Sequence, residues 1–194
     1  SREGTVVLLE DLIYEAEKRA KVIVEQKNPE LSTEKKREIA RKIVLGSIKY
    51  SLLSRDNTKI VTFDWESALD VNGQAAPYIQ YAAVRANSIL RKGKFEIPTS
   101  EEINFELAEK EIALVDLLSR FPQEVKKAAY ELRPLQIANY TYDLAKAFND
   151  FYTHCPVLTA EHEVRTFRLR LVAATKQTII NSLKLLGIEV PEIM

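Results

Sequence analysis

Along most of the chain, apolar residues recur every three to four positions, a spacing that puts them on one face of an α-helix. The first such run holds Leu12, Ala16, Ala20 and Ile23, and it predicts a helix over about 10–27. Only 5 glycines interrupt the 194 residues, so the periodic stretches are long. The pattern indicates a mainly helical protein.

Proline and capping residues mark where the first helix ends and the second begins. Asn28-Pro29 stops the first helix, because proline disfavours the helical region for the residue before it. Ser32 or Thr33 can cap a second helix that runs to about Leu53. The sequence therefore begins with two helices joined by a short turn.

The helical pattern breaks down over residues 55–74. Residues 60–63 fit a short strand, and Asn72-Gly73 is a turn signal. We place the main domain boundary in this stretch. The expected division is a first part over 1–74 and a second part over 75–194.

The second part is predicted to be a helical bundle. Thr99 to Glu102 fits a capping box, and Pro122 suits the first turn of a further helix. The expected helices span about 75–93, 99–119, 122–133, 135–153 and 160–186. The predicted fold class is therefore all-α, a helical bundle preceded by a mainly helical segment.

The composition argues against a disordered chain and against a membrane-spanning protein. Hydrophobic residues make up 46% and charged residues 29%, an ordinary globular balance. Lys+Arg and Asp+Glu both number 28, so any nucleic-acid site must come from local clustering rather than from net charge. No apolar run approaches about 18 residues, so neither a membrane span nor a membrane partner is expected.

The cysteine content and the first residues indicate location and context. Cys155 is the single cysteine, so no disulfide can form within the chain and a cytoplasmic location is expected. Ser1-Arg2-Glu3-Gly4 lacks an initiator Met and the apolar core of a signal peptide. We interpret this start as the cut edge of a longer protein.

Residue patterns that usually carry catalysis are missing from the sequence. The two histidines, His154 and His162, belong to no Cys-x-x-Cys or His-x-x-x-His pattern that would hold zinc. There is no glycine-rich phosphate loop and no nucleophile elbow. No catalytic residue, metal or cofactor is expected here, and a complete small enzyme is the least favoured interpretation.

One stretch has the chemistry of a single-stranded RNA site. Tyr78, Tyr81 and Arg85 can share one helix face, and residues 85–94 carry four cations without an acid. The four are Arg85, Arg91, Lys92 and Lys94. A ring beside a guanidinium can stack on an unpaired base and hydrogen-bond to it. The alternative is a helix that buries its tyrosines and solvates its basic end, and the pattern leaves both open.

A second group of aromatic residues precedes the Cys155-Pro156 break. Most of these rings are expected in the core, since a bundle needs large side chains. Tyr152, at the end of its helix, is the best candidate for an exposed ring. Arg165, Arg168 and Arg170 on the last helix are possible phosphate contacts, although a solvated helix face is the default interpretation.

Longer motifs agree with one protein family. In the second part they lie at 137–145, 148–152, 155–158, 168–171 and 185–194. Upstream they are Lys49-Tyr50, Phe63-Asp64-Trp65 and Pro77-Tyr78-Ile79-Gln80-Tyr81. These segments resemble arginyl-tRNA synthetases, and residues 134–194 resemble the C-terminal part that is called the DALR anticodon-binding domain. At Ile193 the chain departs from the family, which usually has Arg there.

The resemblance implies a division of labour within a longer enzyme. Residues 1–74 resemble the end of a class I catalytic domain, and residues 75–194 resemble the anticodon-binding bundle. The family's HIGH signature and the lysine of its KMSKS signature are missing, so this chain alone is expected not to aminoacylate. The parent would join arginine to tRNA(Arg) with ATP and Mg. Expected partners are the tRNA anticodon loop and the missing catalytic domain, and no DNA is expected.

The resemblance also assigns residues to RNA contact. Anticodon contacts map to Tyr78, Arg85, Tyr152 and Met194, and further candidates are Gln80, Tyr81, Arg91 and Arg168. A helical protein-interaction module and the related domain of another class I tRNA synthetase remain as alternatives. The RNA interpretation requires Tyr78, Arg85 and Tyr152 to converge on an exposed groove.

Overall fold

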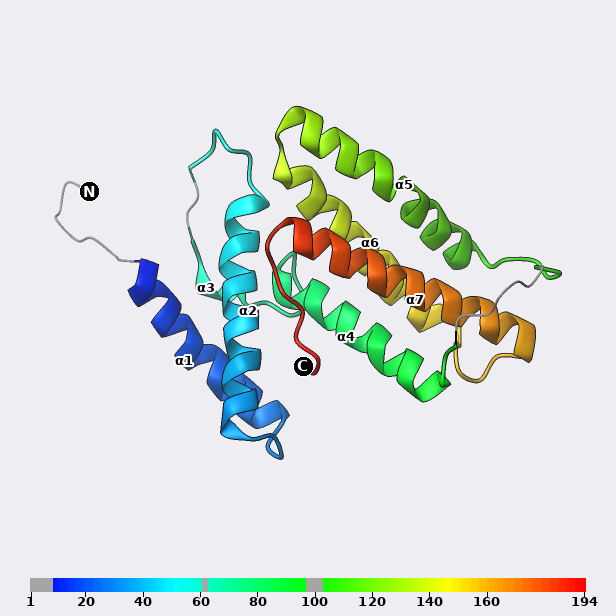
Figure 1. Ribbon diagram of the computed structural model, residues 1–194, viewed down its shortest axis with the longest axis horizontal. Coiled ribbons are helices and arrows are strands. Elements are labelled where there is room, and N and C mark those ends of the chain that lie inside the picture. Colours follow the sequence, from blue (N-terminus) through cyan, green and yellow to red (C-terminus); the bar gives the residue numbers. More distant parts are fainter. Residues whose placement is uncertain (1–8, 61–62, 97–102) are drawn as a thin grey trace.

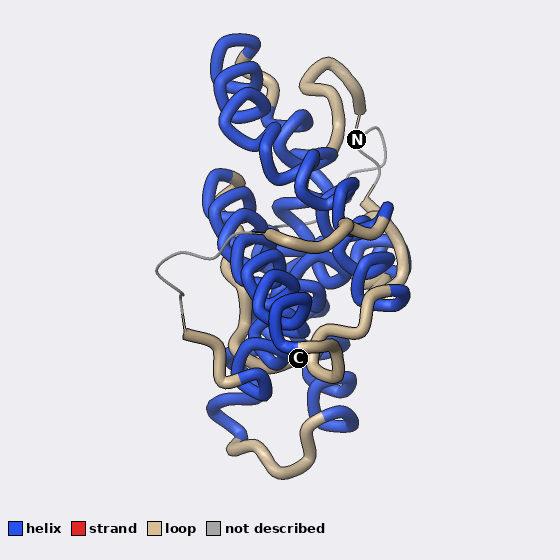
Figure 2. Tube along the Cα trace, turned by 90° about the vertical axis from the view of Figure 1, so that its right-hand side faces the viewer, coloured by secondary structure: helices blue, strands red, loops and turns tan. Residues whose placement is uncertain are grey.

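Seven helices are present in the described residues, 9–60, 63–96 and 103–194, of this computed structural model. They are α1 (Leu9–Lys27), α2 (Thr33–Leu53), α3 (Trp65–Ala68), α4 (Ala76–Gly93), α5 (Glu109–Glu131), α6 (Pro134–His154) and α7 (His162–Leu185), labelled in Figure 1. Over the same ranges there is no strand, and Figure 2 shows the trace as helices and loops alone. The all-α prediction is confirmed. Of the strand predicted at 60–63, residues 61–62 lie outside the described part, and the two flanking residues are irregular.

The helices form two neighbouring groups (Figure 1). α1 and α2 pack against each other on one side, and α4, α5, α6 and α7 form the bundle on the other. The segment after α7 returns between α2 and α4. α2 also contacts α4 and α6, so it joins the two groups. Among the described helices, none has the length and apolar character needed to cross a membrane.

The α1–α2 pair is built on small and branched side chains. Ser32 caps α2, because its hydroxyl accepts a hydrogen bond from the Lys35 backbone N–H at 3.3 Å. Apolar residues spaced by three or four on each helix are buried between the two. The buried set is Ala16, Ala20, Val24, Ile39, Ala40, Ile43, Val44 and Ile48. We call this set the pair core, and Met194 packs against its edge.

The bundle is built on larger side chains. Phe148, Phe151 and Leu144 of α6 are fully buried in one cluster with Leu114 of α5 and residues of α4 and α7. This bundle core confirms that most aromatic residues of α6 are internal. Cys155, directly after α6, is buried in the same cluster, and burial raises the pKa of its thiol.

Tyr50 is a residue of α2 that packs in the bundle core. Its side chain is buried there, and its hydroxyl donates a hydrogen bond to the Ala138 carbonyl of α6 at 3.2 Å. Burial raises the pKa of Tyr50 to about 12, because the phenolate would lose its hydration. The two helical groups therefore share a buried contact and are not independent.

The prediction of two helices between 99 and 133 is wrong. α5 is a single helix over Glu109–Glu131, with Pro122 in its interior. Apolar side chains on both sides of this proline pack into the bundle, namely Leu114, Leu117, Leu118, Phe121, Val125 and Ala128. Their burial outweighs the one helical hydrogen bond that proline removes, so the helix continues.

The start of α5 also differs from the prediction. The capping box predicted at Thr99 to Glu102 lies outside the described residues. The helix begins ten residues later than predicted, at Glu109, where Glu111 Oε2 accepts a hydrogen bond from the Ala108 N–H at 2.6 Å. The acidic half of a capping box is therefore present without a Ser or Thr partner.

Candidate nucleic-acid interface

α4 presents an aromatic and basic stripe beside α6. The helix starts after the extended residue Ala75 and carries Pro77 in its first turn, where proline is tolerated. Tyr81 and Arg85 follow at successive intervals of four residues and lie on one face of the helix. The Arg85 guanidinium donates to the Tyr81 hydroxyl at 3.3 Å and lies 4.8 Å from the centre of its ring. Local helix geometry alone therefore brings this pair together.

α6 supplies the other half of the cluster. The guanidinium of Arg85 lies 5.3 Å from the centre of the Tyr152 ring and donates to Asn149 Oδ1 at 2.9 Å. Arginine favours such aromatic neighbours because its delocalised charge is weakly hydrated. We call Tyr81, Arg85, Asn149 and Tyr152 the Arg85 cluster.

Asn149 was missed by the sequence reasoning. It lies three residues before Tyr152 on α6, a spacing that puts both on one helix face. That spacing could have identified it once Tyr152 was chosen. Its amide oxygen accepts a hydrogen bond from one nitrogen of the guanidinium. The Tyr81 and Tyr152 rings lie beside the same guanidinium and help to orient it.

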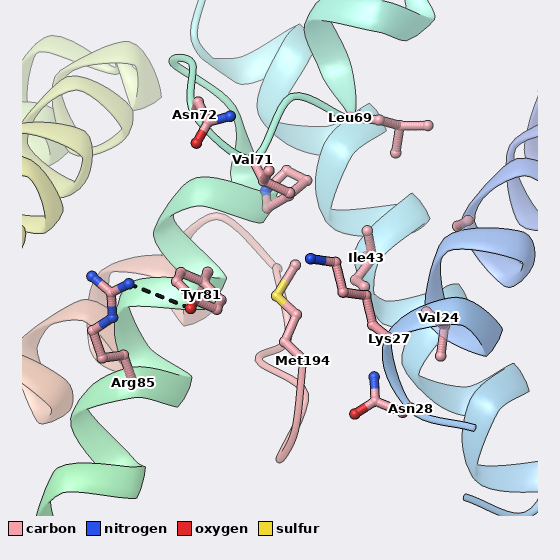
Figure 3. Close-up of a pocket in the computed structure, with 12 residues that line it drawn as sticks. Val24, Lys27, Asn28, Ile43, Leu69, Val71, Asn72, Tyr81, Arg85 and Met194 are labelled. Carbon is pink, nitrogen blue, oxygen red and sulfur yellow. Dashed lines mark hydrogen bonds between the residues drawn. The ribbon is translucent and has the colours of Figure 1, made fainter. Parts of the chain in front are cut away.

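Two adjacent cavities extend from the Arg85 cluster toward the chain's last residues. The larger, of about 330 Å³, lies between the α1–α2 pair and α4, and the smaller, of about 260 Å³, lies along α4. Tyr81, Arg85 and Met194 line both. In Figure 3, the Met194 side chain lies between Tyr81 of α4 and Ile43 of α2. We call the two cavities together the groove.

The walls of the groove differ in character. The larger cavity is mainly apolar, with Val24, Ile43 and Leu69 among its lining residues and Lys27 and Asn72 as polar ones. The smaller cavity has a mixed lining, in which Val84 and Ile193 stand beside polar groups that include exposed Arg91 and exposed Glu192. The groove therefore offers an apolar recess beside a charged rim.

Tyr152 and Tyr78 occupy different environments. Tyr152 is 42% exposed in the last turn of α6, so the prediction that its ring is accessible is confirmed. Tyr78 is only partly exposed, and its ring centre lies 5.5 Å from that of Tyr142. Arg85 is in contact with Tyr81 rather than Tyr78. Tyr152, Arg85 and Tyr81 thus converge, and Tyr78 lies beside them against α6.

Two of the candidate residues need correction. Gln80 is fully buried, and its side-chain amide donates to the Lys42 carbonyl of α2 and to the Glu189 carbonyl. Arg168 donates to the buried Glu111 carboxylate at 2.6 Å and to the Pro156 carbonyl at 2.7 Å. Both side chains are committed to internal partners, so neither is available to RNA.

The charged residues near these helices do not form a metal site. Across the described part of the chain, no group of three or more His, Cys, Asp or Glu side chains is arranged to hold a metal ion. His154 lies on the surface, where its Nδ1 is 3.0 Å from the Asp150 carboxylate. Asp150 also accepts from Lys110 at 2.9 Å, and that hydrogen bond holds the pKa of Asp150 below its usual range.

Comparison with protein families divides the chain in two. A family model described as "DALR anticodon binding domain" matches residues 79–194. A second, described as "tRNA synthetases class I (R), catalytic domain", matches residues 1–65. The Arg85 cluster and Met194 all lie within the first match.

Individual relatives agree with the family matches. Over its whole length the chain is 45% identical to an arginine–tRNA ligase of Pyrococcus furiosus and 40% identical to one of Haloarcula marismortui. It spans about a third of these relatives, 32% and 34% of their lengths. Among solved structures, Thermus thermophilus arginyl-tRNA synthetase superposes with a TM-score of 0.90 and 37% identity, covering 97% of this chain and 32% of that one. The Plasmodium falciparum arginyl-tRNA synthetase gives 0.84 and 26%, covering 97% and 34%.

Proposed function

The chain belongs to the DALR anticodon-binding domain family, and from that premise we propose that it binds the anticodon loop of tRNA(Arg) through the Arg85 cluster and Met194. Its relatives are arginine–tRNA ligases, which supports arginine tRNA as the partner rather than the tRNA of a sibling enzyme.

The observation that carries this proposal is the Arg85 guanidinium held between two rings that are exposed beside the groove. Anticodon bases are unpaired, so they can leave the stack and lie against an aromatic ring or a guanidinium plane. Tyr81 and Tyr152 offer the rings, and Arg85 retains donors for base edges or phosphate. The apolar recess next to Met194 suits the face of a base, and polar groups at the rim suit its edge.

Two further residues have supporting roles in the proposal. Arg91 lines the rim of the groove, six residues beyond Arg85 on α4, and is placed to meet phosphate on the flanking nucleotides. Tyr78, whose ring packs against Tyr142, would hold α4 against α6 beside the cluster. The cations that line the groove are few, namely Lys27, Arg85 and Arg91, so few counterions are released there and we expect modest affinity with a shallow salt dependence.

For the longer protein, we propose the activity that its relatives' names carry, arginine–tRNA ligation with ATP and Mg. This chain would hold the anticodon end of the tRNA while the chemistry takes place in the part of the enzyme beyond it. A cytoplasmic location follows from this role. The proposed boundary near residue 74 is supported by the family matches, which leave residues 66–78 between them, and by the separate pair and bundle cores.

The test is a titration of the 194-residue chain with a tRNA(Arg) anticodon stem-loop and with one whose middle anticodon base is changed, each at two salt concentrations. Tyr152→Ala should weaken binding to the first by roughly 5- to 150-fold, as expected for the loss of one base stack. Arg85→Leu should also reduce the preference between the two loops.

Tyr130→Ala is the matched control, because Tyr130 is 90% exposed on α5, outside the groove. It should bind as the unmodified chain does. Equal affinity for the two loops would leave only a backbone contact, and unchanged binding by both Tyr152→Ala and Arg85→Leu would remove the Arg85 cluster from the interface and favour a protein-interaction module.

A further inference from the structure

We propose that Gln80 is a positioning residue that sets the course of the C-terminal tail, residues 187–194, and thereby places Met194 in the groove. The α2 helix, from the part that matches the catalytic domain, is therefore needed to build the RNA site. This inference rests on the proposed function for its effect on RNA, but its structural part can be tested without RNA.

Gln80 uses both hydrogens of its amide to tie two segments together. Nε2 donates to the Lys42 carbonyl of α2 at 3.2 Å and to the Glu189 carbonyl of the tail at 2.7 Å. The side chain is fully buried, so water cannot replace either bond. From α4, one amide thus fixes the tail to α2 five residues before Met194.

Gly46 of α2 makes this three-way contact possible. A Cβ at that position would lie 2.8 Å from Gln80 Nε2 and 3.1 Å from Ile188 Cγ2. Both the amide and the tail therefore approach the α2 backbone at the one place where it has no side chain. Glycine weakens a helix interior, so its presence here is explained by the close approach.

A second contact holds the beginning of the tail. Gly187 has φ +67°, a left-handed conformation that turns the chain out of α7, and its carbonyl accepts a hydrogen bond from Lys49 Nζ of α2. Ile188 is buried in the bundle core, while Met194 packs against the pair core. The tail thus crosses from one core to the other along α2, and Gln80 holds it at Glu189, directly after Ile188.

The first measurement follows the tail itself. Met194 is the single methionine of the chain, so labelling the methionine methyl group with ¹³C gives one NMR signal from the groove. In Gln80→Leu, which keeps side-chain volume and removes both donors, this signal should move toward the position of a solvent-exposed methionine. Tyr50→Phe is the matched control, because it removes a buried hydrogen bond to Ala138 without touching the tail, and its Met194 signal should stay in place.

The second measurement links the tail to RNA through a double-mutant cycle. Gln80→Leu should weaken stem-loop binding by roughly five- to tenfold, because the freed tail must be ordered on binding. Met194→Ala should weaken it by a similar factor, because it removes the contact that the end of the tail makes with the RNA. The double variant should bind no more weakly than Met194→Ala alone, because Gln80 acts through Met194. Gln80→Ala, which removes both donors without adding an apolar side chain, provides the same test if Gln80→Leu fails to fold, and its effect should also vanish when Met194 is Ala.

The outcomes separate the two proposals. An unmoved Met194 signal in Gln80→Leu, or in Gln80→Ala where only that variant folds, would overturn the positioning role whatever the RNA result. A displaced signal with unchanged RNA affinity would keep the positioning role and remove Met194 from the RNA site. If the fold losses of RNA affinity caused by Gln80→Leu and Met194→Ala multiply in the double variant, Gln80 acts on RNA binding by another route and the proposal fails.

Discussion

The α1–α2 pair and the α4–α7 bundle are both helical, but side chains of different size fill them. The buried set of the pair core is alanines and branched residues such as Ala16, Ala40 and Ile43, whereas the bundle core adds Phe148, Phe151 and several leucines to alanines of its own. Small residues let two helices approach closely but bury little area, and buried apolar area supplies most of the stability. The pair therefore depends on its neighbours, and the contacts that join it to the bundle matter more to it than to the bundle.

The largest expected effect is in the bundle core. Phe148→Ala should cost about 3–5 kcal/mol of unfolding free energy, because the side chain is fully buried and its removal leaves a cavity. Urea unfolding followed by circular dichroism measures this loss. If the cost were no greater than that of a one-carbon change in the pair core, the contrast between the two cores would be wrong.

The second largest expected effect is at the buried ion pair between Arg168 and Glu111, which Arg168→Leu removes. Glu111 is 1% exposed, and removing its arginine leaves a buried carboxylate without its cation, at a cost of about 3 kcal/mol. The change should lower the urea midpoint and leave RNA affinity unchanged at temperatures where the variant is folded. Adding Glu111→Gln should restore part of the stability, and loss of RNA affinity with unchanged stability would return Arg168 to the interface.

Ile43→Val tests whether the α1–α2 pair can open separately from the bundle. The substitution removes one methylene from the pair core and should cost about 1 kcal/mol. Hydrogen exchange should show the loss first in α1 and α2, because the bundle has its own core. Equal acceleration of exchange in all helices would mean that the two groups open only together.

The smallest expected effect is at an ion pair between the groups. Arg133, just before α6, donates to Asp56 after α2 at 2.7 Å, and both side chains are partly exposed. Arg133→Met should therefore change stability by at most about 0.5 kcal/mol, and salt should reduce the difference further. A change above about 1 kcal/mol would show that this contact, rather than buried groups such as Tyr50 and Gln80, holds the pair to the bundle.

Helix positions were largely predictable because proline and capping signals act locally. Asn28-Pro29 and Pro134 mark helix ends that the structure reproduces within a residue or two. Pro122 carries the same local signal, yet packing along the whole of α5 overrides it. Proline therefore predicted the end of a helix correctly, except where an apolar face that continues past the proline is buried along its whole length.

The candidate site was predictable only in part, because contacts within one helix can be read from the sequence and contacts between helices cannot. The Tyr81–Arg85 pair follows from helix spacing, but the contacts of Arg85 with Tyr152 and of Tyr78 with Tyr142 require α6 to lie alongside. The roles of Gln80 and Arg168 are set by partners far away in sequence, on α2 and α5. A single sequence shows such residues as polar and available, and only the packed fold shows that their hydrogen bonds are already made.

The buried thiol of Cys155 makes it possible to measure chemically how often the bundle opens. Thiolate is the reactive form, and burial both covers the sulfur and disfavours its ionisation. An alkylating or disulfide reagent can therefore react only when the end of α6 comes away from its neighbours. Since this is the sole cysteine, each modified molecule records one opening event of the bundle, and the rate of modification reports how often the bundle opens without any engineered probe.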